Sequence, residues 1–134
     1  MQRLDEILSR RREAADRYNK ALADIEGIHL PPQAGIADAS WFVYVVRLDD
    51  AFSPADRDAV LADLREVGVS CSNYFVPIHL QPYIRERLGT GPGDFPVTER
   101  IAARTIALPF FGSLTDEQVD RVRVALTNAL AARR

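Results

Sequence analysis

The sequence predicts an α+β fold, with a small three-stranded sheet, antiparallel or mixed, helices packed on it, and a long helix in front. Three observations favour this class. Helical and strand-like segments alternate along the chain, the strand-like segments are short, and 47% of the 134 residues are hydrophobic, which is enough for one core. We expect a connecting helix over residues 1–27 and a small α/β domain over residues 28–134.

The first segment is helical by its spacing. Apolar residues recur on one face, and neither proline nor glycine interrupts the segment before Gly27. We therefore expect the helix to stop at Gly27, since glycine readily adopts the left-handed conformation that follows a helix. At about 1.5 Å per residue, such a helix is ~35 Å long, which is long for a small domain. Its apolar face comprises Leu4, Ile7, Leu8, Ala15, Tyr18, Leu22 and Ile25.

Three segments are rich in β-branched or aromatic residues and are predicted strands. They cover residues 40–48, residues 69–76 and residues 105–108. Residues 29–32 contain two consecutive prolines and are predicted to form an extended turn. The sheet should therefore contain three short strands and have a thin core.

Helix starts are marked by capping signals. Ser53, Pro54 and Asp56 form an N-cap, a first-position proline and a capping acid, which predict a helix ending at Gly68. Thr115 and Gln118 form a capping box for the last helix. Two short helices are expected over residues 83–88 and 97–104. The apolar face of the last helix comprises Val119, Val122, Leu126, Ala129 and Leu130.

Composition excludes several classes of function. The formal net charge of −2 provides no basic face for nucleic acid or for anionic lipid. The single cysteine, Cys71, excludes an internal disulfide and suits a reducing compartment. No apolar run is long enough to span a bilayer, and the N-terminal residues lack the apolar core of a secretory signal. We expect a soluble cytoplasmic protein that binds neither nucleic acid nor membrane.

The segment NYFVPIHLQPY, residues 73–83, is the strongest candidate for a functional site. Pro77 and Pro82 fix φ and remove two backbone donors, so the segment cannot lie inside a helix or a central strand. It carries His79, one of the two histidines of the chain. A stiff, irregular loop that presents polar side chains is typical of a binding site held by a scaffold.

Four side chains of this segment are candidate ligand contacts. His79 and Gln81 offer hydrogen-bond donors and acceptors, and Tyr74 and Tyr83 offer aromatic faces and hydroxyls. This set suits a hydroxyl-rich ligand such as a sugar. It contains no pair of nucleophile and base, so we expect no catalytic residue here. The alternative is a loop histidine that is merely hydrogen-bonded to the backbone.

Other chemistries have weaker signals. His29 and His79 are far apart and no CxxC or HxxxH spacing is present, so no metal site is expected. Cys71 is expected to be a buried inert thiol, and a nucleophilic role would require His79 nearby in space. The loop over residues 89–93 lacks the lysine and hydroxyl residue of a phosphate loop and is expected to be a turn.

Lysine is rare in this chain. Lys20 is the one lysine among the 17 basic residues, and the others are arginines. A buried lysine can become a nucleophile, whereas arginine does not titrate usefully. Lysine chemistry therefore involves Lys20 or lies outside this chain.

Three stretches together resemble a known family. In order, they are LDEILSRRREAADRYNKAL, YFVPIHLQPYIRERLG and FPVTERIAARTIALPFFGSLTDEQVDRV. They are similar to the C-terminal part of the DegT-like sugar aminotransferases. These are fold-type I enzymes that use pyridoxal phosphate and act on nucleotide-linked keto sugars. The resemblance covers nearly the whole chain.

The resemblance implies transfer of an amino group from glutamate or glutamine to the cofactor and then to a keto sugar. In that family, the Schiff-base lysine and the acid on the pyridine nitrogen belong to a large N-terminal domain. Lys20 does not match the lysine motif. We therefore expect pyridoxal phosphate in the parent enzyme, with no catalytic or cofactor-binding residue in this chain.

The resemblance also assigns substrate contacts to the central segment. His79 matches a Pro-x-His position that lines the sugar site in many members, and Tyr74 or Phe75 matches an aromatic residue just before it. Gln81 and the proline after it match as they stand. Ile84 departs from an aromatic residue that many members have, so the resemblance assigns no sugar-stacking contact to this position.

The sequence is thus interpreted as the small C-terminal domain of a sugar aminotransferase, inactive alone and contributing one wall of the sugar pocket. The parent is expected to be a homodimer. Apolar surface that faces the large domain would be exposed here and would favour self-association. Two alternatives remain, a stand-alone ligand-binding or regulatory module and a mainly structural module that serves dimer contacts.

Overall fold

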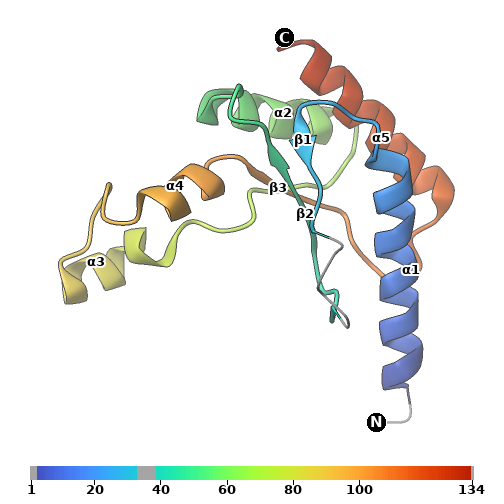
Figure 1. The fold of residues 1–134 in the computed structure, drawn as a ribbon, viewed down its shortest axis with the longest axis horizontal. Coiled ribbons are helices and arrows are strands. Elements are labelled where there is room, and N and C mark those ends of the chain that lie inside the picture. The colour runs from blue at the N-terminus through green and yellow to red at the C-terminus, as the bar shows by residue number, and fades with distance from the viewer. Residues whose placement is uncertain (1–2, 33–38, 134) are drawn as a thin grey trace.

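The computed structural model describes residues 3–32 and 39–133. These residues form an α+β fold in which three strands carry helices on one side and a long excursion on the other (Figure 1). The elements in chain order are α1 (Leu4–Leu22), β1 (Ile28–His29), β2 (Tyr44–Leu48), α2 (Pro54–Glu66), the 3₁₀ turn η1 (Ile78–Leu80), α3 (Pro82–Leu88), α4 (Pro96–Ala102), β3 (Thr105–Leu108) and α5 (Asp116–Ala131).

The sheet is three-stranded and antiparallel, in the order β1-β2-β3. Tyr44 pairs with Leu108, and Val46 pairs with Ile106. Because side chains alternate across a strand, these four residues lie on one face of the sheet, and all are buried. Their neighbours along the strands, such as Val45, are only half-buried. The predicted fold class is therefore confirmed, with the core on one face of the sheet.

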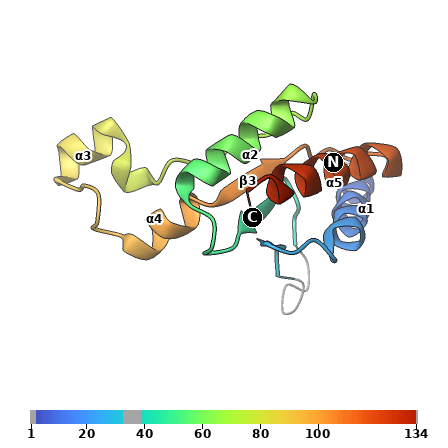
Figure 2. The same ribbon diagram turned by 90° about the horizontal axis from the view of Figure 1, so that it is seen from above.

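Helices α1, α2 and α5 supply the other side of this core (Figure 2). The buried face of α5 comprises Val119, Val122, Leu126, Ala129 and Leu130, the same residues that helical spacing predicts. The capping boxes of Ser53 and Thr115 are also present as predicted. None of the helices in the described ranges has the length and apolar character needed to cross a lipid bilayer.

Helix α1 ends five residues earlier than predicted. Its last residue is Leu22, and the amide of Ile25 bonds to the carbonyl of Leu22 in a tight turn. Gly27 does have a positive φ of 88°, but it serves the turn into β1, where its carbonyl accepts from the amide of Asp49. Residues 1 and 2 of the predicted helix lie outside the described residues.

The membership of the sheet differs from the prediction. Residues 69–76 do not form a strand, and they contribute a single bridge between Ser72 and Ala107. The amide of Val69 is already used by the carbonyl of Leu64, which completes the C-terminal cap of α2 around Gly68. After Ser72 the chain leaves the sheet.

The third strand is instead β1, whose second residue, His29, is the first residue of the predicted extended turn. Ile28 and His29 pair with Leu48 and Arg47. Two residues give too little pattern for a strand prediction, and Pro31 and Pro32, which follow after Leu30, cannot donate to a ladder. Strand β2 also begins later than predicted, at Tyr44.

Residues 73–104 form an excursion that we call the arm. It carries η1, α3 and α4 and projects from the sheet on the side away from α1 and α5 (Figure 1). Pro82 is the first residue of α3, and Gly89 ends it in the left-handed conformation. The base of the arm is held by Arg57, whose Nη1 donates to the carbonyls of Ala102 and Thr105.

Candidate functional site

An apolar groove of about 500 Å³ runs along the arm. One side is formed by the segment around η1, including Tyr74, Ile78 and Gln81, and the other by Thr98 and Ile101 of α4. The two sides are separated by about 20 residues of sequence, and the arm brings them together. A mostly apolar groove with a few polar groups at its edge is a common form of ligand site.

Two of the four predicted site residues line this groove. Tyr74 is half-buried, and its ring packs against Phe75 with centroids 4.4 Å apart. Gln81 follows η1 directly and is exposed. The lining of the groove therefore includes one amide side chain and one phenol, and their role as ligand contacts stays a prediction.

Tyr83 lies beside the groove rather than in its lining. It is the second residue of α3 and is 64% exposed. Its hydroxyl accepts a 2.7 Å hydrogen bond from Nη1 of Arg87, one helical turn later. A ligand that reached Tyr83 would meet the arginine as well.

His79 is buried in η1, with 8% of its surface exposed. Its Nε2 lies 2.9 Å from Oε1 of Glu99, and its ring packs on Phe95 with centroids 4.7 Å apart. Its carbonyl accepts from the hydroxyl of Thr90 at 2.7 Å. The imidazole is thus bonded to a carboxylate from α4, which neither sequence alternative for this histidine included.

Glu99 is the functional candidate that sequence reasoning missed. Besides His79, its carboxylate accepts from the amide of Gly93 at 2.9 and 3.0 Å and from the amide of Phe95 at 3.3 Å. The hydrogen bond from His79 holds the pKa of Glu99 below its ordinary value, and the two amides act in the same direction. The available signal was an acid in the first turn of a helix, which is common and unspecific.

The other reactive side chains considered from the sequence, Cys71 and His29, are bonded to groups outside the groove. Cys71 is buried, its thiol donates to the carbonyl of Leu61 at 3.7 Å, and burial raises its pKa, which disfavours the thiolate. His29 pairs with Asp49, whose Oδ1 lies 2.5 Å from Nε2. Within residues 3–32 and 39–133, no group of three or more His, Cys, Asp or Glu side chains is arranged to hold a metal ion.

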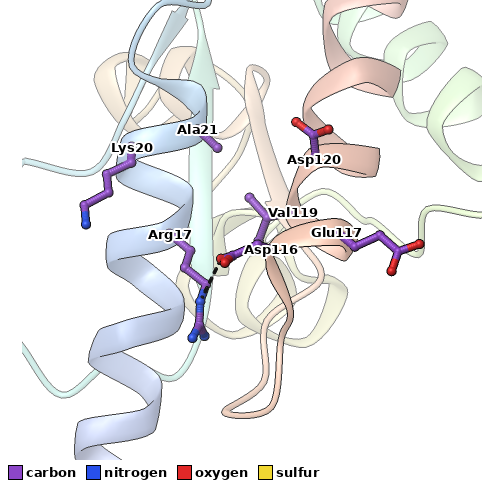
Figure 3. Close-up of a pocket in the computed structure, with 7 residues that line it drawn as sticks. All are labelled: Arg17, Lys20, Ala21, Asp116, Glu117, Val119 and Asp120. Atoms are coloured by element: carbon purple, nitrogen blue, oxygen red, sulfur yellow. Dashed lines mark ion pairs between the residues drawn. The ribbon is translucent and has the colours of Figure 1, made fainter.

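A second, wider groove lies between α1 and α5 and has a volume of about 840 Å³ (Figure 3). Arg17 bridges it through a 2.9 Å contact between its Nε and Oδ1 of Asp116. Lys20 belongs to its rim but is exposed and extends away from α5 (Figure 3). A Schiff-base lysine needs an enclosed site that also holds the pyridine ring. Lys20 and its neighbours do not fit pyridoxal phosphate.

Comparison with known proteins identifies relatives over almost the whole chain. The sequence profile of the DegT/DnrJ/EryC1/StrS aminotransferase family matches residues 1–127. The spore coat polysaccharide biosynthesis protein SpsC of Bacillus subtilis (strain 168) is 32% identical over 123 residues, which are 91% of this chain and 32% of SpsC. The chain therefore spans about a third of the length of this relative.

Solved structures give the same result. The aminotransferase TlmJ from Streptoalloteichus hindustanus is 33% identical with a TM-score of 0.80, over 98% of this chain and 34% of TlmJ. S. venezuelae DesV, solved in complex with a ketimine intermediate, is 29% identical with a TM-score of 0.81, over 99% of this chain and 34% of DesV. On this evidence, the chain belongs to the DegT/DnrJ/EryC1/StrS aminotransferase family.

Proposed function

We propose that this chain is the C-terminal part of a pyridoxal-phosphate-dependent enzyme that transfers an amino group from glutamate or glutamine to a nucleotide-linked keto sugar. The observation that carries the proposal is the family match over residues 1–127. Support comes from TlmJ, described as an aminotransferase, and from SpsC, described as a polysaccharide biosynthesis protein. Over the aligned residues, SpsC is 32% and TlmJ 33% identical to this chain.

In this proposal the chain binds substrate and leaves the chemistry to the rest of the enzyme. Pyridoxal phosphate would supply the electron sink for transamination. Lys20 is exposed on α1 and does not fit that cofactor, so the cofactor and its lysine belong to residues outside this chain. The division into a connecting helix over residues 1–27 and a domain over residues 28–134 is part of the same proposal.

The groove along the arm is the proposed sugar wall. The ring of Tyr74 offers a face for a sugar ring, and the amide of Gln81 can donate to and accept from hydroxyls. Tyr83 adds a hydroxyl beside the groove. His79 is assigned to the same wall, where its Nε2 is occupied by Glu99, so that a direct contact would use Nδ1 or the ring edge.

The arm also carries the surface proposed to face the rest of the enzyme. Many of its large apolar side chains are exposed, and Ile78 reaches 74% and Phe75 65%. Exposed apolar clusters of this kind mark interaction surfaces. We assign this surface to packing against the remaining two thirds of a homodimeric parent enzyme. Its exposed apolar residues are Phe75, Val76, Ile78, Tyr83, Leu88, Phe95, Val97 and Ile101.

The test uses the full-length protein that contains this chain. It should bind pyridoxal phosphate, convert it to the aminated form with glutamate or glutamine, and return it to the original form with a nucleotide-linked keto sugar. Absorbance of the cofactor reports both steps. An enzyme that completes the first step and rejects every keto sugar would contradict the proposed substrate class. Failure to bind the cofactor would contradict the reaction.

The alternative of a stand-alone module is tested by the same measurements on this chain alone. This chain, expressed alone, should neither bind pyridoxal phosphate in stoichiometric amounts nor transaminate. A borohydride-trapped cofactor on Lys20 would show that the chain does chemistry by itself. Tight binding of a nucleotide sugar by the isolated chain would favour a ligand-binding module instead.

A further inference from the structure

We propose that Glu99 is a positioning residue of the sugar wall. It holds the imidazole of His79 in one tautomer, with Nδ1 left as an acceptor, and thereby sets the distance between the two sides of the groove. This inference rests on the proposed function for its role in substrate binding. The hydrogen bonds that carry it belong to the described part of the chain.

The bond joins the two sides of the groove at one point. On one side, His79 follows Ile78, which lines the groove. On the other side, Glu99 follows Thr98, which lines it from α4. The 2.9 Å contact between Nε2 and Oε1 therefore connects η1 to α4 directly behind the lining residues. The imidazole is buried and the carboxylate is partly exposed, with side-chain exposures of 9% and 24%, so that water reaches this bond from the side of Glu99 only.

The same carboxylate also holds the loop before α4. The amide of Gly93 donates to both of its oxygens, and the amide of Phe95 donates to Oε1. The ring of Phe95 in turn packs on the imidazole of His79. Three donors and one ring contact thus converge on a single pair of side chains. A group held from several directions has one orientation rather than several.

The acceptor character of Glu99 selects the tautomer of His79. The backbone amides of Gly93 and Phe95 donate to the carboxylate of Glu99 and favour its ionised form, which only accepts hydrogen bonds. Nε2 of His79 must therefore carry a proton. In the neutral imidazole, Nδ1 is then the acceptor. The same holds for other histidines whose second ring nitrogen donates to a carboxylate. With Nε2 bonded to Glu99, Nδ1 is the ring nitrogen left to accept a hydrogen bond, for which a sugar hydroxyl is the proposed donor.

The tautomer can be measured on this chain directly. Two-bond ¹H–¹⁵N correlation spectra of histidine rings distinguish the Nε2–H form from the Nδ1–H form. The chain contains two histidines, so His29→Gln leaves a single set of signals from His79. Spectra are recorded at a series of pH values, because the two tautomers are distinguished in the neutral ring. We expect the Nε2–H form to dominate, and a dominant Nδ1–H form would overturn the proposal.

Two variants then distinguish the effect of the hydrogen bond between His79 and Glu99 from a general effect on folding. Glu99→Gln keeps the size and one acceptor oxygen, so the chain should remain folded while the tautomers become mixed. Glu86→Gln, on the exposed surface of α3, is the matched control and should leave the spectrum of His79 unchanged. A spectrum of Glu99→Gln with the same tautomer population as the parent chain would contradict the assignment.

The kinetic test uses the full-length enzyme. If Glu99 positions His79 for the sugar, Glu99→Gln should raise the KM for the keto sugar roughly fivefold and leave the rate of the amino donor step unchanged. Mixed tautomers together with an unchanged KM would overturn the positioning role. If the full-length protein does not transaminate, the proposed function fails, whereas the spectra still decide the tautomer.

Discussion

The ring of Tyr18 in α1 stacks on that of Tyr44 in β2, with centroids 4.7 Å apart. The hydroxyl of Tyr18 donates a 2.7 Å hydrogen bond to the carbonyl of Pro109, and that of Tyr44 donates a 2.6 Å bond to Oδ1 of Asn19. Burial raises the pKa of both phenols, so both stay protonated donors. Helix α1 is therefore joined to the sheet through the core of the small domain, in addition to any connecting role.

The first prediction concerns this contact between α1 and the sheet. Tyr18→Phe keeps the ring stacking but leaves the carbonyl of Pro109 without its donor. We expect a loss of about 1–2 kcal/mol in the free energy of unfolding, measured by urea denaturation at an unchanged m-value. Tyr83→Phe is the matched control, since its hydroxyl is exposed, and it should cost less than about 0.5 kcal/mol. Equal losses in both variants would contradict the role of the buried bond.

The second prediction concerns acid stability. The pKa of Glu99 is lowered by its bond to His79, and the other described partners of its carboxylate are backbone amides. A carboxyl group whose pKa is lower in the folded state than in the unfolded state stabilises the fold at pH values above its unfolded pKa, which is 4.5 here. That contribution is lost as the pH falls through the folded value.

Glu99→Gln removes this titration. The variant should be less stable than the parent chain at neutral pH, and the gap between the two should shrink as the pH falls below 4.5, the unfolded value. Denaturation midpoints at a series of pH values measure this gap. A gap that stays constant down to acid pH would show that Glu99 titrates alike in the folded and unfolded states.

The third prediction concerns the exposed arm. The isolated chain should self-associate, because the apolar surface of the arm includes side chains such as Ile78 that are mostly exposed. Size-exclusion chromatography over a range of concentrations should show earlier elution as concentration rises. Ile78→Asp should reduce this shift, and Val124→Asp on the exposed face of α5 should leave it unchanged. Equal effects of both variants would assign self-association to another surface.

Capping signals and amphipathic spacing predicted most of the helices correctly. The boxes at Ser53 and Thr115 are local interactions, readable within four residues. Strands depend on partners far along the chain, so they were predicted less well. Residues 69–76 have strand composition, but the cap of α2 takes the amide of Val69 and leaves one bridge at Ser72. β1 is too short to have a pattern.

The candidate site was predicted only in part for the same reason. Tyr74 and Gln81 both line the groove, since they belong to a single stiff segment, and their contact with a ligand stays a prediction. The partner of His79 could not be read from the sequence, because Glu99 is 20 residues away and resembles any first-turn acid. Long-range contacts of this kind are set by how the arm folds back on itself.

The most direct test of the central claim separates the two half-reactions in the full-length enzyme. Gln81→Ala removes an exposed amide at the rim of the proposed sugar wall. Single-turnover absorbance measurements should show an apparent Kd for the keto sugar raised about three- to tenfold, which corresponds to one lost hydrogen bond, with unchanged kinetics for the amino donor. Identical sugar kinetics in Gln81→Ala and the parent enzyme, or an equal loss in both half-reactions, would contradict the assignment of this arm to sugar binding.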